Sequence, residues 1–334
     1  MNLDQITRLA LFQADQITQA GTVGSFVTTT ELVAWANQAN RYVETALRAL
    51  REDYFLRTWN SSTDTTATRI MGIDYTPSTS LRIAADTIRY TLPPDFLSVK
   101  YIRAVTAGYE FIKFFPRDIS HADMQGMLFW STDNSATPGR DMYFDIQADR
   151  TMLLLPALNA TVDIEFSYIS RSHPLVRYAT GTLAITTATT AATGVGTTWS
   201  TLTPFDVNYL DIMFGSSGSA TLPTVDPTWD YDQANLARVS TITNDTTLDI
   251  AANKIGTLAA GTGYILSSVP VVPNEHHYLL ADYVTFRILA KQGSRKAVAY
   301  RDLFRDGLTS LQQTSGVRQQ LDAEFVDPWL PEGR

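Results

Sequence analysis

The sequence predicts an α+β protein, with helices at both ends of the chain, a small antiparallel sheet and an inserted all-β module. Three observations lead to this class. Apolar residues recur at helical spacing near both ends, and residues 88–170 alternate or cluster as strands do. Residues 176–268 contain 20 threonines in 93 positions. Because β-branched threonine favours pleated backbone, this last block should consist of strands and turns.

Composition limits the classes of function. The net charge is −8 and no cysteine is present, so disulfides and thiolate metal sites are excluded. Tight binding to DNA phosphates needs a face rich in lysine and arginine, which an acidic chain of this kind is not expected to offer. Only 18% of residues are charged, which suggests surfaces covered by neighbours.

The N-terminal segment does not resemble a signal peptide, because acids and glutamines interrupt its apolar residues. No run approaches the ~18 apolar residues of a membrane span. We therefore expect a soluble chain without a membrane partner.

The first elements are predicted to be helices. Apolar residues between Leu3 and Ala10 follow helical spacing. Thr28 and Glu31 have the spacing of a capping box, and the apolar stripe behind them predicts the clearest helix of the chain, ending near Asp53.

Strand signals follow in the next block, and the paired prolines of TLPPDFL predict a stiff turn between two strands. Residues 121–140 are predicted to be an irregular excursion. The expected strands are IRYTLP (88–93), LSVKYIRAV (97–105), DMYFDI (141–146), TMLLLP (151–156) and TVDIEFSYI (161–169).

The threonine-rich block is predicted to be an inserted domain, entered near Arg171 and left at residues 268–273. Its expected strands are GTLAITT, NYLDIMF, RVSTIT, TLDI and GYILSS.

Two helices should follow Pro273, with Asn274 as N-cap and an interruption at Gly293 and Ser294. They carry a surplus of basic residues, for which two interpretations are open: a solvated face with i,i+4 partners, or a contact surface for an acidic neighbour. Two prolines in EFVDPWLPEGR prevent a regular helix at the C-terminal end. The basic residues are Arg287, Lys291, Arg295, Lys296, Arg301 and Arg305.

Four segments resemble the portal adaptor (head-to-tail connector) proteins of tailed bacteriophages. TTELVAWANQANRYV resembles the opening helix of that family, and IRYTLPPDFLSVKYIRAV its strand-turn-strand. VPNEHHYLLADYVTFRILAKQGS and AVAYRDLFRDGLTSL are similar to its two C-terminal helices. The match covers roughly 1–55, 88–170 and 270–315, by pattern and order rather than by identity.

The inserted block is similar to small β-barrel decorations of phage tail and connector proteins. TTATTAATGVGTTWS, RVSTITNDTTLDI and GTGYIL carry this resemblance in the expected order. Residues 208–214 lack the usual glycine before the aspartate, and residues 221–237 are extra.

The resemblances imply a helical bundle with a small sheet over residues 1–172 and 270–318, an inserted all-β barrel domain over 173–269, and an extended tail over 319–334. The family forms a ring, usually dodecameric, whose channel continues that of the portal protein and passes DNA. The C-terminal tail would then dock onto the portal, and its candidate anchors are Phe325, Val326, Trp329 and Leu330.

No motif predicts an enzyme, and we expect no catalytic residue, metal or cofactor. GVGTT (194–198) lacks the lysine of a phosphate loop, and His276-His277 has no evident third ligand. Asp226, Asp230 and Asp232 lack the spacing of a calcium loop, although calcium there stays open.

The predicted function is a structural adaptor in the virion, assembled in the host cytoplasm and bound to the portal, to its own copies and to a downstream tail protein such as a nozzle, stopper or fibre-binding component. One alternative is that the chain is itself a nozzle or stopper. Another is a glycan-binding protein that uses Trp199, Trp229 and Tyr231 of the inserted domain. A cell-wall hydrolase is a third class without a recognisable motif.

Overall fold

The fold is mixed α+β, with four α-helices and several sheets in the described residues, as the sequence predicts for the class. The structure is a computed structural model. It describes residues 1–16, 26–50, 55–60, 68–70, 73–75, 83, 87–92, 95–106, 108–109, 112–118, 141–147, 151–155, 161–186, 190–202, 209–223, 235–251 and 257–325.

The chain divides into two compact units. The first contains Met1–Tyr54 and Ser172–Arg334, and the second contains Phe55–Arg171. The break near residue 172 coincides with a predicted boundary, but the grouping differs from the one we expected. The small sheet forms a unit of its own, and the threonine-rich module belongs with the helices.

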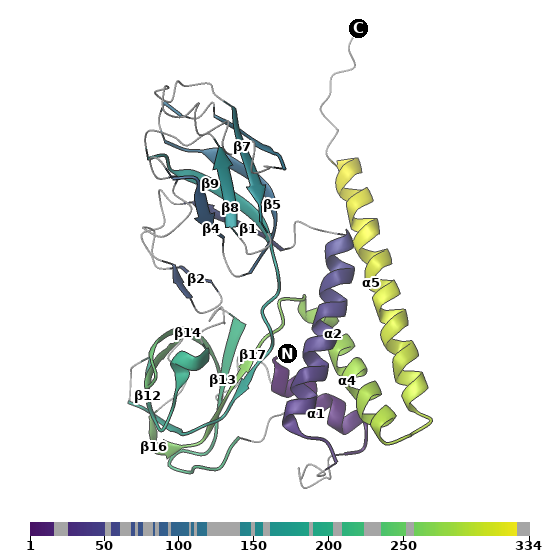
Figure 1. The fold of residues 1–334 in the computed structure, drawn as a ribbon. Coiled ribbons are helices and arrows are strands. Elements are labelled where there is room, and N and C mark those ends of the chain that lie inside the picture. The colour runs from purple at the N-terminus through teal and green to yellow at the C-terminus, as the bar shows by residue number, and fades with distance from the viewer. Residues whose placement is uncertain are drawn as a thin grey trace. The chain divides into compact units, whose positions relative to one another are not determined.

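Helices from the two ends of the chain pack against one another in the first unit (Figure 1). α4 contacts α1, α2 and α5, and α2 also contacts α5. Ala36, Ala39 and Val43 of α2 are fully buried, as are Leu279 and Leu280 of α4. The helices are α1 (Leu3–Gln13), α2 (Thr29–Leu50), α4 (His277–Lys291) and α5 (Ala297–Phe325).

Side-chain caps begin the first two helices. The Asn2 side chain accepts from the Gln5 N–H, and the Gln5 side chain accepts from the Asn2 N–H, so α1 has a capping box. The box predicted for α2 is confirmed, because Thr28 Oγ1 accepts from the Glu31 N–H at 3.2 Å and Glu31 Oε2 accepts from the Thr28 N–H at 2.9 Å.

The start of α4 differs from the prediction, whereas the break between α4 and α5 agrees with it. Asn274 is not the N-cap of α4, because it opens the 3-10 helix η5 (Asn274–His276) and no side chain caps α4. A 3-10 turn after Pro273 lets the chain enter the helix through backbone bonds alone. The break at Gly293 is confirmed, since this residue has a φ of +68° that few side chains tolerate.

α5 continues to Phe325, so residues 319–325 of the predicted extended tail are helical. Proline first occurs in this region at Pro328, and the residues before it include good helix formers.

The second unit contains several sheets rather than one small antiparallel sheet. β9 is the central strand of the three-stranded sheet β1-β9-β5, and β6 pairs with β7 in parallel in the sheet β4-β8-β7-β6. All five predicted strands are present, whereas β1, β2, β3 and β6 were not predicted. The strands are β1 (Leu56–Asn60), β2 (Thr68–Ile70), β3 (Ile73–Tyr75), β4 (Arg89–Thr91), β5 (Phe96–Ala104), β6 (Lys113–Pro116), β7 (Asp141–Ile146), β8 (Thr151–Leu155) and β9 (Ile164–Ser170). Residues 121–140 lie outside the described residues.

The threonine-rich module forms an eight-stranded antiparallel sheet with the order β10-β17-β13-β14-β15-β12-β11-β16. The described strands form no closed barrel, because β10 and β16 are the two ends of this order and do not pair. β10 has only two residues, which is too few to form the ladder of hydrogen bonds that would close the sheet into a barrel. The strands are β10 (Arg177–Tyr178), β11 (Thr182–Ile185), β12 (Ala191–Val195), β13 (Leu210–Phe214), β14 (Leu236–Asn244), β15 (Thr247–Ile250), β16 (Leu258–Thr262) and β17 (Tyr264–Ser268).

The module has a core of its own, centred on Trp199 of the 3-10 helix η3 (Trp199–Leu202). Trp199 is fully buried, and its Nε1 donates to the Tyr264 hydroxyl at 2.8 Å. That hydroxyl in turn donates to the Thr180 carbonyl at 2.7 Å. The polar atoms of both rings are therefore satisfied inside the core.

A side-chain amide of α2 holds the segment that enters the module. Asn37 Nδ2 donates to the Leu175 carbonyl at 2.8 Å, and Asn37 Oδ1 accepts from the Leu175 N–H at 2.7 Å. About two turns further along α2, Glu44 accepts from the Ser172 N–H at 3.1 Å. These bonds replace a strand partner and attach the entering segment to α2.

Candidate functional site

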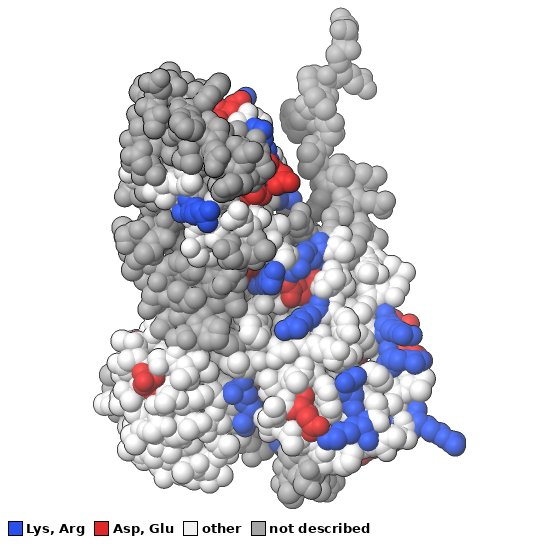
Figure 2. All heavy atoms as spheres, viewed as in Figure 1, with Lys and Arg blue, Asp and Glu red and all other residues white. Residues whose placement is uncertain are grey.

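Six basic residues of α4, of α5 and of the turn between them were predicted to form a contact surface, here called the basic surface: Arg287, Lys291, Arg295, Lys296, Arg301 and Arg305. Figure 2 shows blue side chains over the helices with red ones among them, whereas the visible face of the eight-stranded module is almost uncharged. The basic surface is therefore interrupted by acids instead of forming a continuous positive field.

Lys291 is engaged within its own unit. Its Nζ donates to Glu31 Oε1 at 2.7 Å and to the Phe26 carbonyl at 3.0 Å, and it lies 5.1 Å from the centre of the Phe26 ring. The hydrogen bond from Lys291 is the main reason why the pKa of Glu31 is lowered to about 2. This lysine ties the end of α4 to the start of α2.

Three other basic residues also have partners in the same unit. Lys296 Nζ lies 3.5 Å from Asp15 Oδ2, and Arg301 pairs with Asp302 at 3.0 Å. The Arg287 guanidinium lies 5.9 Å from the centre of the Trp35 ring. Arg295 and Arg305 are exposed and form no ion pair with a described residue.

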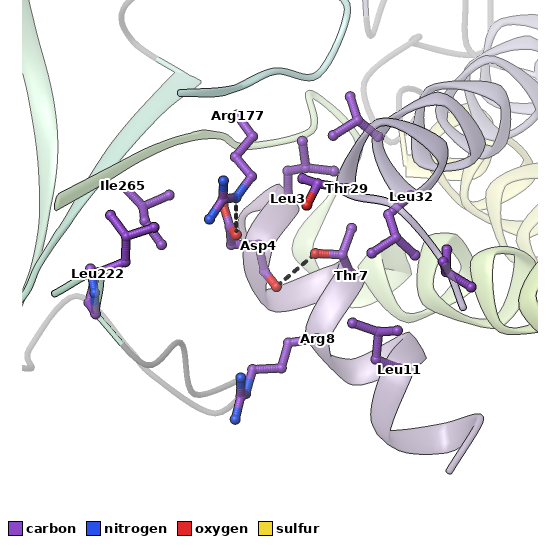
Figure 3. A pocket seen from close by; sticks show the side chains of 13 residues that line it. Leu3, Asp4, Thr7, Arg8, Leu11, Thr29, Leu32, Arg177, Leu222 and Ile265 are labelled. Carbon is purple, nitrogen blue, oxygen red and sulfur yellow. Dashed lines mark hydrogen bonds and ion pairs between the residues drawn. The ribbon is translucent and has the colours of Figure 1, made fainter. Parts of the chain in front are cut away.

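A pocket of about 210 Å³ lies between α1, the start of α2 and the eight-stranded module (Figure 3). Its walls are mostly apolar. The apolar side chains include Leu11, Val27, Leu32, Val33, Pro223 and Ile265.

Polar groups occupy one end of this pocket. Arg177 Nε donates to Asp4 Oδ1 at 2.8 Å, as the dashed line in Figure 3 marks. Asp4 Oδ2 is buried and has no hydrogen-bond partner. Arg8 also lines the pocket and forms no ion pair within the described part of the chain. The pocket therefore offers a ligand two guanidinium groups beside an apolar wall.

The ion pair at the pocket also attaches the module to α1. Ser267 Oγ of β17 accepts from the Asp4 N–H at 2.9 Å, and Asn2 Nδ2 lies 3.7 Å from Met213 Sδ of β13. These contacts explain why the module and the helices form one compact unit. No sequence motif marks this site, because Asp4 and Arg177 are 173 positions apart.

The predicted anchors of the C-terminal tail are only partly visible. Phe325 is the last residue of α5, and Val326, Trp329 and Leu330 lie outside the described residues.

The aromatic residues of the glycan alternative receive no support. Trp199 is fully buried in the module core and cannot stack on a sugar. Trp229, Tyr231 and the acidic residues Asp226, Asp230 and Asp232 lie outside the described residues.

One residue of the histidine pair, His277, is held by contacts inside the fold. His277 is fully buried between the Val272 carbonyl, 2.7 Å from Nε2, and the Met1 amino group, 2.9 Å from Nδ1. Burial lowers the pKa of His277 to about 4. Within the described residues, no group of three His, Cys, Asp or Glu is arranged to hold a metal ion. GVGTT forms the end of β12 and the segment that leads to η3, where Gly196 has a φ of +69°.

Comparison with known proteins gives no match: neither a protein-family model nor a curated protein sequence matches this chain. Among the described residues, no helix has the length and apolar character needed to cross a membrane.

Proposed function

We propose that this chain is a structural head-to-tail adaptor of a tailed bacteriophage. Copies of the chain form a ring, dodecameric in the family that it resembles, between the portal protein and a downstream tail protein. The ring acts mechanically, without catalysis or a cofactor, in the virion.

The packing of the N-terminal helices against the C-terminal helices is the observation that supports this proposal most. α1 and α2 contact α4, although more than two hundred residues separate them in the chain. The strand-rich parts therefore lie in the sequence between helices that pack together. We propose that these helices are the bundle of an adaptor core. We propose further that the curled eight-stranded module corresponds to the small barrels of phage connectors and contacts the downstream tail protein.

The surface of α5 offers side chains for contacts between copies. Val298 is 51% exposed and Leu303 is 53% exposed, and Arg305 lies exposed on the same helix without an ion pair to a described residue. Neighbouring copies in a ring meet through two different surfaces. These side chains of one copy would therefore contact a different surface of the next copy.

The charge distribution is compatible with a channel that lets DNA pass. The net charge is −8, and four of the six residues of the basic surface are engaged with acids or aromatic rings. A wall with few free cations releases few counterions from DNA and therefore binds it weakly.

Electron microscopy of the full chain mixed with the portal protein of the same virus tests the proposal. We expect rings of the chain stacked on the portal with a continuous channel. Particles in which the portal carries no added ring at micromolar concentrations would contradict the adaptor function.

Two variants test the finer roles. The full chain with Trp329→Ala and Leu330→Ala should no longer bind portal in a pull-down, whereas Glu332→Ala serves as the matched control in the same segment. Virions whose adaptor lacks the module should fail to attach the tail, and normal attachment would exclude the module as the tail contact.

A further inference from the structure

The pocket beside α1 has a polar end and an apolar wall, which together favour a ligand of a definite chemistry. Asp4 is 7% exposed, and its Oδ2 is buried without a partner. Arg8 and Arg177 beside it favour an acidic group.

The apolar wall and the volume favour a bulky side chain. A cavity of about 150 Å³ holds a benzene molecule, and this pocket measures about 210 Å³. The ligand should therefore combine a large apolar group and a nearby carboxylate.

The C-terminal segment of this chain has that combination. Trp329 supplies a bicyclic apolar ring with one N–H donor, and Leu330 lies next to it. Asp327 and Glu332 flank the pair with carboxylates. We propose that the pocket of one copy binds residues 326–334 of a second copy, with Trp329 in the apolar part and the flanking acids near Arg8 and Arg177.

The geometry of α5 favours a second copy over the same chain. α5 starts near the pocket, since Lys296 pairs with Asp15 and Asp15 follows the helix that lines the pocket. α5 has 29 residues, so its C-terminal end lies about 43 Å from its start. Four residues from Phe325 to Trp329 span at most about 14 Å, which is too short for a return.

This inference deepens the proposed function, on which it rests for the claim that copies form a ring. A contact from the end of one copy to the pocket of the next is heterologous and extends around a ring. The same side chains are proposed to dock onto the portal, so the two contacts exclude each other. We assign the pocket contact to copies that have not yet met the portal.

Fluorescence anisotropy with a labelled peptide of residues 324–334 tests the inference. The receptor is the full chain carrying Trp329→Ala and Leu330→Ala, so that its own tail does not compete. We expect saturable binding, and Arg8→Glu in the receptor should weaken it at least about tenfold, because a like charge then faces the acidic peptide. Arg295→Glu makes the same charge change on the basic surface and should alter binding less than about twofold.

Three outcomes would overturn the inference: no saturation up to millimolar receptor, equal effects of Arg8→Glu and Arg295→Glu, or loss of portal binding by Arg8→Glu when the peptide itself does not bind. The last result would assign the pocket to the portal. Rings on the portal together with absent peptide binding would leave the adaptor function intact and reject only the pocket contact. Peptide binding without rings on the portal would support the pocket contact and contradict the adaptor function.

Discussion

Asp282 of α4 offers a direct test of how burial acts on the contact between α1 and α4. Burial raises the pKa of this carboxyl from 3.8 to about 6, although the Gln13 side chain donates a hydrogen bond to it at 3.4 Å. The folded state therefore binds the proton more tightly than the unfolded state. The carboxyl contributes most to stability at low pH, and this contribution is lost as the pH rises through about 6.

Asp282→Asn removes the charge and keeps the shape. The shift from 3.8 to about 6 corresponds to an upper limit of about 3 kcal/mol, and a realistic gain for this partly buried group is about 1–3 kcal/mol at pH 7.5. At pH 4 the folded protein is already protonated at this position, so the gain should almost vanish.

Urea unfolding followed by circular dichroism at 222 nm measures this difference in the free energy of unfolding. Asp306→Asn, an exposed change on α5, is the control and should leave stability nearly unchanged at both pH values. An Asp282→Asn variant that is equally stable or less stable than the parent at pH 7.5 would refute the reasoning. A gain of the same size at pH 4 would also refute it, because the effect would then not come from titration.

Three further substitutions test packing and hydrogen bonding. Gly307→Ala should lower the melting temperature, because the new Cβ would lie 2.1 Å from a buried leucine side chain of α4 and overpacking costs about 1–3 kcal/mol; a rise in melting temperature would contradict this close approach. Trp199→Phe should destabilise the module by about 1–3 kcal/mol in denaturant titrations, since it leaves a cavity and removes the hydrogen bond to Tyr264. Asn37→Ala should cost about 1–3 kcal/mol by leaving two backbone groups of the entering segment unpaired, whereas Gln38→Ala on the same helix should cost less than about 0.5 kcal/mol.

Local signals in the sequence predicted most elements correctly. The apolar stripe and the pair Thr28 and Glu31 predicted α2 together with its cap, and Gly293 predicted the break between α4 and α5. Short strands such as β6 and β10 were missed, because two to four residues hold too little periodicity to be recognised. The cap at Asn274 was wrong, since a 3-10 turn and a capped helix have similar sequence signals.

The candidate site could not be predicted in the same way. The six basic residues were visible in the sequence, but the partners Glu31, Asp15 and Trp35 come from α2 and from the end of α1, near the other end of the chain. The pocket depends on the same kind of distant contact, between Asp4 and Arg177.

The sequence by itself determined the fold class, the cap of α2, the break between α4 and α5, and the strand-rich character of residues 176–268, because capping, periodicity and β-branching act between residues a few positions apart. Tertiary structure alone decided that the eight-stranded sheet stays open, that the module joins the helices, and that a pocket with an unpaired carboxylate oxygen forms beside α1. These features depend on which distant surfaces pack together, and a local pattern of residues carries no information about that choice.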